Sequence, residues 1–209
     1  MHQFPRGSGW IEVICGSMFA GKTQELIRRL RLAALARQKV QVFKHTLDRR
    51  FGREDLVSHD QIRVPSQPVR RAADILGRLR PGVRVVGIDE AHFFGATIVP
   101  VCQTLADRGL RVIVAGLDQD YRARPFEPMA QLLAVAEYVD KLLAICLVCG
   151  GPAGRSQRLG EGRKRIDVGH SDKYEARCRR CFRPARAKLP SRASRRRRRA
   201  APPAPGGRA

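Results

Sequence analysis

The 209-residue chain lacks the long apolar runs of a membrane protein. No stretch approaches the roughly 18 consecutive apolar residues of a membrane-spanning helix, and the first ten residues lack the apolar stretch of a signal peptide. Aromatic residues make up only 6% of the chain, but hydrophobic residues reach 43%, enough to bury a core. Wholesale disorder is therefore excluded, and we expect a cytoplasmic protein of one domain, or one domain with a small appendage.

Acidic residues are scarce as well. Only 19 of them face 41 Lys and Arg residues, which gives a formal net charge of +22. From Arg183 to the end there are ten basic residues and no acidic one, so residues 1–182 carry only +12. The final residues 191–209 are too rich in Arg, Ala, Pro and Gly to pack a core. We interpret residues 184–209 as a basic, disordered tail, and the alternative is an arm that binds nucleic acid weakly.

Up to about Ile145, short β-branched runs alternate with helical stretches, which predicts an α/β fold with a parallel sheet. No internal repeat is present. Strands are expected at Ile11–Cys15, Val40–Lys44, Val83–Asp89, Leu110–Leu117 and Tyr138–Ile145. Helices are expected at Thr23–Arg37, Pro68–Leu79, Thr97–Arg108 and Pro128–Ala136, and a mobile loop at Thr46–Asp60.

One segment between a predicted strand and a predicted helix fits the phosphate-loop pattern G-x-x-x-x-G-K-[ST] without a mismatch. Its glycines let the backbone curl around one anion, and the helix N-terminus adds positive potential. Lys22 is expected to reach the β- and γ-phosphates of ATP, and the Thr23 hydroxyl to bind Mg²⁺. The predicted ATP-binding residues of the loop are Gly16, Ser17, Met18, Phe19, Ala20, Gly21, Lys22 and Thr23.

A second apolar run, Val85–Ile88, ends in the acidic pair Asp89 and Glu90. Asp89 is suited to hold Mg²⁺, directly or through water. Glu90 is expected near the γ-phosphate, where a carboxylate accepts a proton from an attacking hydroxyl. Adjacent Asp-Glu is also common in ATPases, in which the Glu activates water, and Glu90 could also be a solvated acid at the strand end. The Asp89–Glu90 pair alone therefore does not distinguish a kinase from an ATPase.

Four of the six cysteines form two hooks, Cys146-x-x-Cys149 and Cys178-x-x-Cys181, with 28 residues between them. Two such hooks predict a tetrahedral thiolate zinc site, and a disulfide is the weaker interpretation in a chain without a secretion signal. Because cysteine sulfurs fill all four positions, the predicted Zn²⁺ is structural and clasps the two ends of a polar segment. The two remaining cysteines are expected to pack in the core.

These motifs together resemble one family. The phosphate loop, the sequence Ile-Asp-Glu-Ala-x-Phe-Phe, and a cysteine clasp with Asp-Lys-Tyr before its second hook follow one another over roughly residues 9–183. The combination resembles type II (cytosolic-type) thymidine kinases. The resemblance implies an α/β fold of the P-loop (RecA-like) class, with a mostly parallel sheet and a small C-terminal zinc-binding lasso domain. It also implies a kinase domain over residues 1–145 and a zinc-binding domain with a lasso over 146–183, ahead of the tail.

The family transfers the γ-phosphoryl group of ATP to the 5′-hydroxyl of thymidine, and of deoxyuridine, in nucleotide salvage. The resemblance therefore implies Mg²⁺ bound with ATP, in addition to structural Zn²⁺. By motif match, Glu90 corresponds to the family's general base and Asp89 to its metal-associated acid. Asp48 and Arg50 fall where the family has an Asp-x-Arg near the phosphates, so Arg50 is expected to help neutralise the transferred charge.

A nucleoside pocket is implied in the same way. Phe93 corresponds to the ring against thymine, and Ser156 falls where a Thr commonly lines the pocket for the 5-methyl group. The segment between the hooks is similar to the family's lasso, which reads the base through backbone groups and closes over it to exclude water. The implied substrate-binding residues are Met18, Phe93, Leu117, Tyr121, Phe126, Ser156, Val168, Gly169, His170 and Tyr174.

The chain departs from the family pattern at two positions. Ala91 and His92 follow the acidic pair, and both belong to the expected ATP and Mg²⁺ site, but the family usually has Gln in place of His92. The sequence therefore does not establish whether His92 makes the substrate or phosphate contact expected at this position. In the lasso, Gly169-His170 stands where the family has Gly-Gly or Gly-Ala, and we expect His170 to be a solvated loop residue.

The resemblance further suggests a homotetramer, feedback inhibition by thymidine triphosphate, and no membrane partner. The main competing interpretation is a zinc-ribbon P-loop ATPase that acts on nucleic acid, which would give the basic charge a purpose. Against it, only Tyr174 and Phe182 are available near the hooks for base stacking. A third alternative is a phosphate-loop relic that binds nucleotide without catalysis.

Overall fold

A single sheet of six strands organises the molecule. It belongs to a computed structural model, in which residues 7–48, 55–57, 63–160 and 173–183 are described. The strand order is β5-β2-β6-β7-β1-β8, and all neighbouring strands run parallel. The bounds are β1 Trp10–Gly16, β2 Val40–His45, β5 Gln67–Val69, β6 Val85–Asp89, β7 Arg111–Leu117 and β8 Tyr138–Leu142. The α/β fold with a parallel sheet is thus confirmed.

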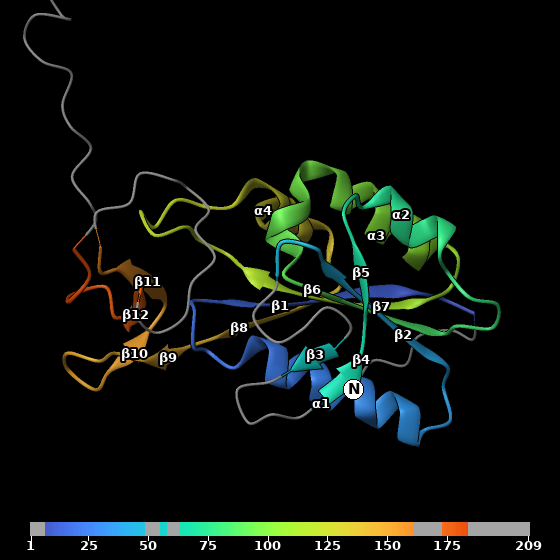
Figure 1. Ribbon diagram of the computed structural model, residues 1–209, viewed down its shortest axis with the longest axis horizontal. Helices are drawn as coiled ribbons and strands as arrows, with labels where there is room; N and C mark the ends of the chain where they lie inside the picture. Colours follow the sequence, from blue (N-terminus) through green and yellow to red (C-terminus); the bar gives the residue numbers. More distant parts are fainter. Residues whose placement is uncertain (1–6, 49–54, 58–62, 161–172, 184–209) are drawn as a thin grey trace, which may run out of the picture.

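Helices cover both faces of this sheet, as Figure 1 shows. Helix α1 (Lys22–Leu35) lies on one face, and α2 (Ala73–Gly77), α3 (Ile98–Asp107) and α4 (Glu127–Val135) lie on the other. All five residues of β6 are buried, as expected for a parallel strand covered on both sides. In the described ranges no helix, including α1 with its 14 residues, combines the length and apolar character needed to cross a membrane.

Two cores result from this layering. The larger one lies between the sheet and helices α2 to α4 and includes the fully buried Ile88 and Leu105. The smaller one lies under α1 and includes Leu30 and Ile113. Helix α1 approaches β6 closely because Gly87 has no side chain: a Cβ there would lie 2.9 Å from the Leu30 methyl carbons. The sheet and its helices are therefore held by large aliphatic side chains.

Three small two-stranded sheets complete the described fold. β3 (Asp55–Val57) pairs with β4 (Arg63–Pro65) near α1. The other two, β9 (Ala144–Ile145) with β10 (Pro152–Ala153) and β11 (Arg155–Arg158) with β12 (Tyr174–Arg177), lie together at one end of the molecule (Figure 1). We call residues 144–160 and 173–183, which contain these two sheets and the four hook cysteines, the cysteine module.

Several predicted boundaries are wrong. The predicted helix Pro68–Leu79 begins in fact as strand β5, and α2 starts only at Ala73. β5 is one of the two edge strands, and edge strands tolerate proline. The predicted strand Tyr138–Ile145 is divided, because β8 ends at Leu142 and β9 pairs in another sheet.

Two further differences lie beside the site. Within the predicted loop Thr46–Asp60, residues 55–57 form a strand, and residues 49–54 and 58–60 lie outside the described ranges. The 3₁₀ helix η1 (Ala91–Thr97), which follows the acidic pair, was not predicted. The other predicted strands and helices lie within a few residues of their predicted positions, whereas strands β4, β10, β11 and β12 were not predicted.

Candidate active site

The phosphate loop connects β1 to α1 and begins at Gly16. Gly16 has a φ of 143°, and a Cβ there would lie 2.2 Å from the Leu142 carbonyl oxygen, so only glycine fits. Phe19 and Gly21 adopt left-handed backbone conformations, with φ of 66° and 79°. This curl delivers the amides at the start of α1, which have no intrahelical acceptor, to one point. The loop has the geometry of an anion site.

Three side chains converge beside the loop. Lys22 Nζ donates a hydrogen bond to the Ser17 carbonyl at 2.6 Å. Thr23 Oγ1 donates to Asp89 Oδ2 at 3.0 Å, although the two residues are 66 positions apart. The carboxyl ends of β1 and β6 meet at the same edge of the sheet, which brings the threonine hydroxyl to the aspartate. A hydroxyl and a carboxylate are the protein oxygens that hold Mg²⁺ beside a phosphate loop.

Glu90 follows Asp89 in a left-handed conformation, with φ of 52°. Its amide donates to Asp89 Oδ1 at 2.9 Å, and the residue is buried. A non-glycine residue in this region stores strain and is found disproportionately at functional sites. The turn directs the chain into η1 and places Glu90 at the same sheet edge as the phosphate loop.

His92 lies between Glu90 and the end of β7 and is hydrogen-bonded to β7. Its Nδ1 accepts a hydrogen bond from the Leu117 amide at the end of β7 (3.2 Å) and lies 3.5 Å from Glu90 Oε2. Its ring also packs between Phe93 and Phe126, with centroids 4.1 and 5.0 Å away. Because Nδ1 accepts the Leu117 amide hydrogen, it has no proton to donate to Glu90, and His92 is a buried residue bonded to β7 beside the Glu90 carboxylate. The adjacent Ala91 is fully buried.

Tyr121 and Tyr174 are brought together by a residue that the sequence did not single out. Arg158 on β11 places its guanidinium carbon 3.9 Å from the centroid of the Tyr121 ring. Its Nη2 donates to the Tyr174 hydroxyl at 2.6 Å. Tyr121 follows β7, whereas Arg158 and Tyr174 are paired across β11 and β12, so the arginine fastens the cysteine module to the α/β core.

Two serines join the module to the phosphate loop. Ser156 Oγ accepts a hydrogen bond from the Met18 amide at 3.0 Å. Ser17 Oγ donates to the Ala153 carbonyl at 3.1 Å. Both serines are buried, and Ala20 packs against the small apolar cluster of the module. Three of the eight loop residues, Ser17, Met18 and Ala20, therefore contact the module directly.

Asp48 is buried just beyond β2, where its amide donates to the His45 carbonyl at 2.9 Å. Four predicted site residues lie outside the described residues, and they are Arg50, Val168, Gly169 and His170. The structure thus gathers the predicted loop, acidic pair, aromatic residues and Ser156 at one end of the sheet.

A second pair that the sequence did not reveal lies under the phosphate loop. Lys141 Nζ is 2.7 Å from Asp118 Oδ2. Lys141 lies beside Cys15 on β8, and Asp118 comes two residues after Gly116, which lies beside Cys15 on β7. The ion pair therefore spans the end of β1 just below Gly16. Neither residue belongs to a recognisable motif, so only the strand order could reveal the pair.

The four hook cysteines form one cluster, and their sulfur atoms all lie within 4.8 Å of one another. Zinc–sulfur bonds of about 2.3 Å at tetrahedral angles require sulfurs about 3.8 Å apart, so the cluster fits Zn²⁺. The amides of Cys178, Val148 and Cys149 lower the pKa of the Cys146 thiol to about 6, which favours the thiolate that binds metal.

The two remaining cysteines behave differently. Burial, followed by the negative charge of Asp118, raises the pKa of Cys15 to about 11, and burial raises that of Cys102 to about 12. Both are buried in the larger core, as predicted.

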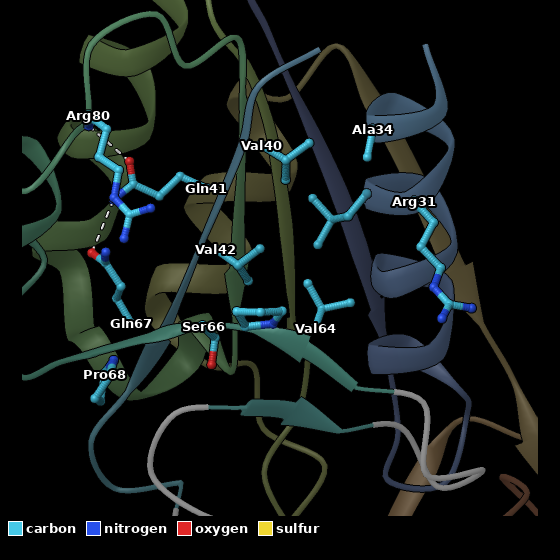
Figure 2. A pocket seen from close by; sticks show the side chains of 12 residues that line it. Arg31, Ala34, Val40, Gln41, Val42, Val64, Ser66, Gln67, Pro68 and Arg80 are labelled. Atoms are coloured by element: carbon cyan, nitrogen blue, oxygen red, sulfur yellow. Dashed lines mark hydrogen bonds between the residues drawn. The ribbon is translucent and has the colours of Figure 1, made fainter. Parts of the chain in front are cut away.

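A separate cavity of about 450 Å³ lies between α1, β2 and the β4–β5 segment (Figure 2). Gln41 in its wall donates to Gln67 at 3.0 Å and accepts from the Arg80 amide at 2.9 Å. None of the predicted site residues lines this cavity. It is therefore distinct from the candidate active site.

Comparison with known proteins gives concordant results. The profile of the family described as thymidine kinase matches residues 9–182. A thymidine kinase of Rhodothermus sp. is 62% identical over 178 residues, covering 85% of this chain and 83% of that protein. A thymidine kinase of Bdellovibrio bacteriovorus is 54% identical over 176 residues, covering 84% of this chain and 86% of that protein.

Solved structures give more distant likenesses. Domain III of the Thermotoga maritima replication initiation protein DnaA is 16% identical, with a TM-score of 0.40, over 66% of this chain and 56% of that chain. The Thermotoga maritima RuvB Holliday junction branch migration motor is 13% identical, also with a TM-score of 0.40, over 68% and 40%. Such distant likenesses say nothing of activity. The family profile and the two close relatives, by contrast, span most of the sequence, and the chain belongs to the thymidine kinase family.

Proposed function

We propose that the protein transfers the γ-phosphoryl group of ATP to the 5′-hydroxyl of thymidine, and of deoxyuridine, to give the monophosphate in nucleotide salvage. The observation that carries this proposal is the juxtaposition of the phosphate loop, the Thr23–Asp89 pair and Glu90 at one sheet edge, in a chain of the thymidine kinase family. The two close relatives are themselves thymidine kinases.

In the proposed reaction the nucleoside O5′ attacks the γ-phosphorus in line with the departing ADP oxygen. A bond forms between O5′ and phosphorus, the bond to ADP breaks, and the proton of the hydroxyl passes to a Glu90 carboxylate oxygen. The Lys22 ammonium has three donors, so it would keep its bond to the Ser17 carbonyl and contact the phosphates with the others. Thr23 and Asp89 would hold Mg²⁺, which neutralises developing charge when bound with ATP, and Arg50 would add to this neutralisation.

The nucleoside pocket is proposed to lie between the core and the cysteine module. Phe93 is half-buried beside His92, and Leu117, Tyr121 and Phe126 follow from the end of β7 and the segment after it. Met18, Ser156 and Tyr174 would close the module side of the pocket. Backbone groups of Val168, Gly169 and His170 are proposed to read the base, as in the family resemblance.

The domain organisation is proposed to follow the same division. Residues 1–145 would be the ATP-binding kinase domain, residues 146–183 the zinc-binding domain with its lasso, and residues 184–209 a basic tail. The four hook cysteines would hold structural Zn²⁺, because their sulfurs form a cluster of fitting size. We also propose a cytoplasmic homotetramer that thymidine triphosphate inhibits.

The test is an assay of the purified full chain with ATP, Mg²⁺ and thymidine, followed by separation of thymidine monophosphate. A parallel reaction contains single-stranded DNA in place of thymidine. We expect monophosphate with thymidine and no acceleration of ATP turnover by DNA. Acceleration by DNA without any monophosphate would overturn the kinase proposal in favour of the nucleic-acid ATPase.

A further inference from the structure

One peptide unit of the phosphate loop is held from both sides. The carbonyl of Ser17 accepts a hydrogen bond from Lys22 Nζ at 2.6 Å, and the amide of Met18 donates to Ser156 Oγ at 3.0 Å. The Ser17 carbonyl and the Met18 amide belong to the same planar trans peptide, so they point in opposite directions within one rigid plane. The module hydroxyl and the phosphate-binding lysine therefore act on a single rigid group, although Ser156 is 138 positions from Met18.

The contact lies in a buried and tightly packed setting. Ser156 is only 4% exposed, and its strand β11 is fixed by pairing with β12. The neighbouring hydrogen bond from Ser17 to the Ala153 carbonyl is buried as well. A hydrogen bond away from water has fewer competing partners and orients its groups more strongly. Ser156 can therefore hold the plane of this peptide in one orientation.

The Met18 amide is thereby separated from the amides that would receive phosphate. Because it is directed to Ser156, it cannot at the same time face an anion in the centre of the loop. The residues that follow, with left-handed Phe19 and Gly21, lead to the amides at the start of α1, which have no intrahelical acceptor. Ser156 thus acts on the outer wall of the loop and does not compete for phosphate.

We propose that Ser156 is a positioning residue for the phosphate loop, which holds the Ser17–Met18 peptide so that Lys22 stays at the ATP phosphate site. This role is additional to any contact of Ser156 with the base, and it rests on the proposed kinase function. A nucleoside that settles against Ser156 then also stiffens the ATP site. Because coupling between two ligands is reciprocal, each raises the affinity of the other.

The test measures ATP binding to Ser156→Ala in the full chain without any nucleoside, by equilibrium titration. We expect the Kd for ATP to rise roughly two- to tenfold, which corresponds to the loss of one hydrogen bond. Binding of AMP is expected to stay unchanged, because AMP lacks the phosphates that Lys22 reaches. Ser156→Thr keeps the hydroxyl and is expected to restore the wild-type Kd.

Gln157→Ala provides the matched control on the same strand. The Gln157 side chain bonds the Arg158 carbonyl and the backbone of Arg183, and neither partner belongs to the loop, so its removal is expected to leave the Kd for ATP unchanged. An unchanged Kd for ATP in Ser156→Ala, with a raised KM for thymidine, would reduce Ser156 to a wall of the nucleoside pocket and overturn the proposal. Failure of the wild-type chain to bind ATP would instead overturn the proposed function.

A second measurement on the wild-type chain covers the case in which Ser156→Ala does not fold. Hydrogen exchange of the Met18 amide reports the bond to Ser156 directly. We expect this amide to exchange slowly without ligand and more slowly still with thymidine. Exchange of the Met18 amide at the rate of an unprotected peptide, with or without thymidine, would contradict the proposal.

Discussion

The α/β core and the cysteine module bury different kinds of side chain. The core buries large aliphatic residues completely, such as Ile88, Leu105 and Ile113. The main apolar cluster of the module consists of small residues, Ala144, Ala153 and Ala176 with three of the hook cysteines. Of its larger apolar side chains, Tyr174 and Phe182 are buried, whereas Leu147 and Val148 are 70% and 55% exposed. The burial of so little apolar surface cannot by itself offset the entropy of ordering the chain.

The comparison shows that the two regions are stable for different reasons. The core is held by apolar burial, whereas the module needs a cross-link, which the sulfur cluster can provide by binding Zn²⁺. Both regions nonetheless contribute to one site, since module groups contact the phosphate loop and Tyr121. In the proposed mechanism the groups that take part in phosphoryl transfer belong to the core, whereas the module groups position the phosphate loop.

The largest expected effect follows from removing one hook. Replacing Cys178 and Cys181 with Ser removes half of the proposed zinc ligands, and structural zinc contributes about 10–16 kcal/mol in small zinc-binding folds. We expect the module to lose its bound zinc and its resistance to proteolysis, while the helical circular dichroism of the core is kept. Zinc quantitation and limited proteolysis check this, with Cys102→Ala as the thiol-removing control. If the double variant retained one zinc per chain, the proposal that zinc bound by the four hook cysteines stabilises the module would be wrong.

The second effect separates chemistry from positioning. Glu90→Gln keeps the shape of the side chain but removes the proposed proton acceptor, so we expect kcat to fall by about 10²-fold or more. Zinc content and the Kd for ATP are expected to remain unchanged. Glu127→Gln, an exposed acid in the first turn of α4, is the control and should have wild-type kcat. A Glu90→Gln enzyme with wild-type kcat would remove this residue from the mechanism.

The sequence predicted the core more fully than the site because the core signals are local. The alternation of apolar runs located five of the six strands of the main sheet and helices α1, α3 and α4, and the loop motif located Lys22 and Thr23 before any contact was known. Pro68 was misread because a proline near the start of an apolar run favours a helix, whereas its place at the sheet edge became clear only from the strand order.

The contacts between core and module could not be predicted in the same way. The bond between Met18 and Ser156 joins residues 138 positions apart, and neither type signals the other. The same holds for Arg158 above Tyr121. Such pairs depend on how two independently patterned regions dock, which no local period or spacing encodes.

The third effect concerns the core alone. Leu30 on the buried face of α1 is 1% exposed, so Leu30→Ala leaves a cavity and is expected to lower the free energy of unfolding by about 2–5 kcal/mol. Leu35 on the same helix is 79% exposed, and Leu35→Ala is expected to change it by no more than about 0.5 kcal/mol. Urea unfolding followed by helical circular dichroism checks both, and zinc content should be the same in both variants. If both substitutions lowered the free energy of unfolding equally, burial of apolar side chains would not be what stabilises the packing of α1 on the sheet.

The smallest expected effect uses acid to probe a charged network in the core. Glu12 is buried in β1, where it accepts hydrogen bonds from Arg111, Arg29 and Trp10. Burial by itself raises the pKa of Glu12, but the hydrogen bonds from Arg111, Trp10 and Arg29 outweigh it, and the net pKa lies below its ordinary value of 4.5. The carboxylate therefore binds protons less readily in the folded chain than in the unfolded one.

A lowered pKa means that Glu12 stabilises the fold above the unfolded value and that this stabilisation is lost as pH falls through the folded value. Glu12→Gln is thus expected to lower the free energy of unfolding by about 1–3 kcal/mol at pH 7, as for hydrogen bonds to a charged group. The difference from wild type should shrink steadily as pH falls below about 4.5. Urea unfolding followed by helical circular dichroism isolates the core, because the described part of the module contains no helix. If the difference in free energy of unfolding between wild type and Glu12→Gln stays constant with pH, the charge of Glu12 does not stabilise the core.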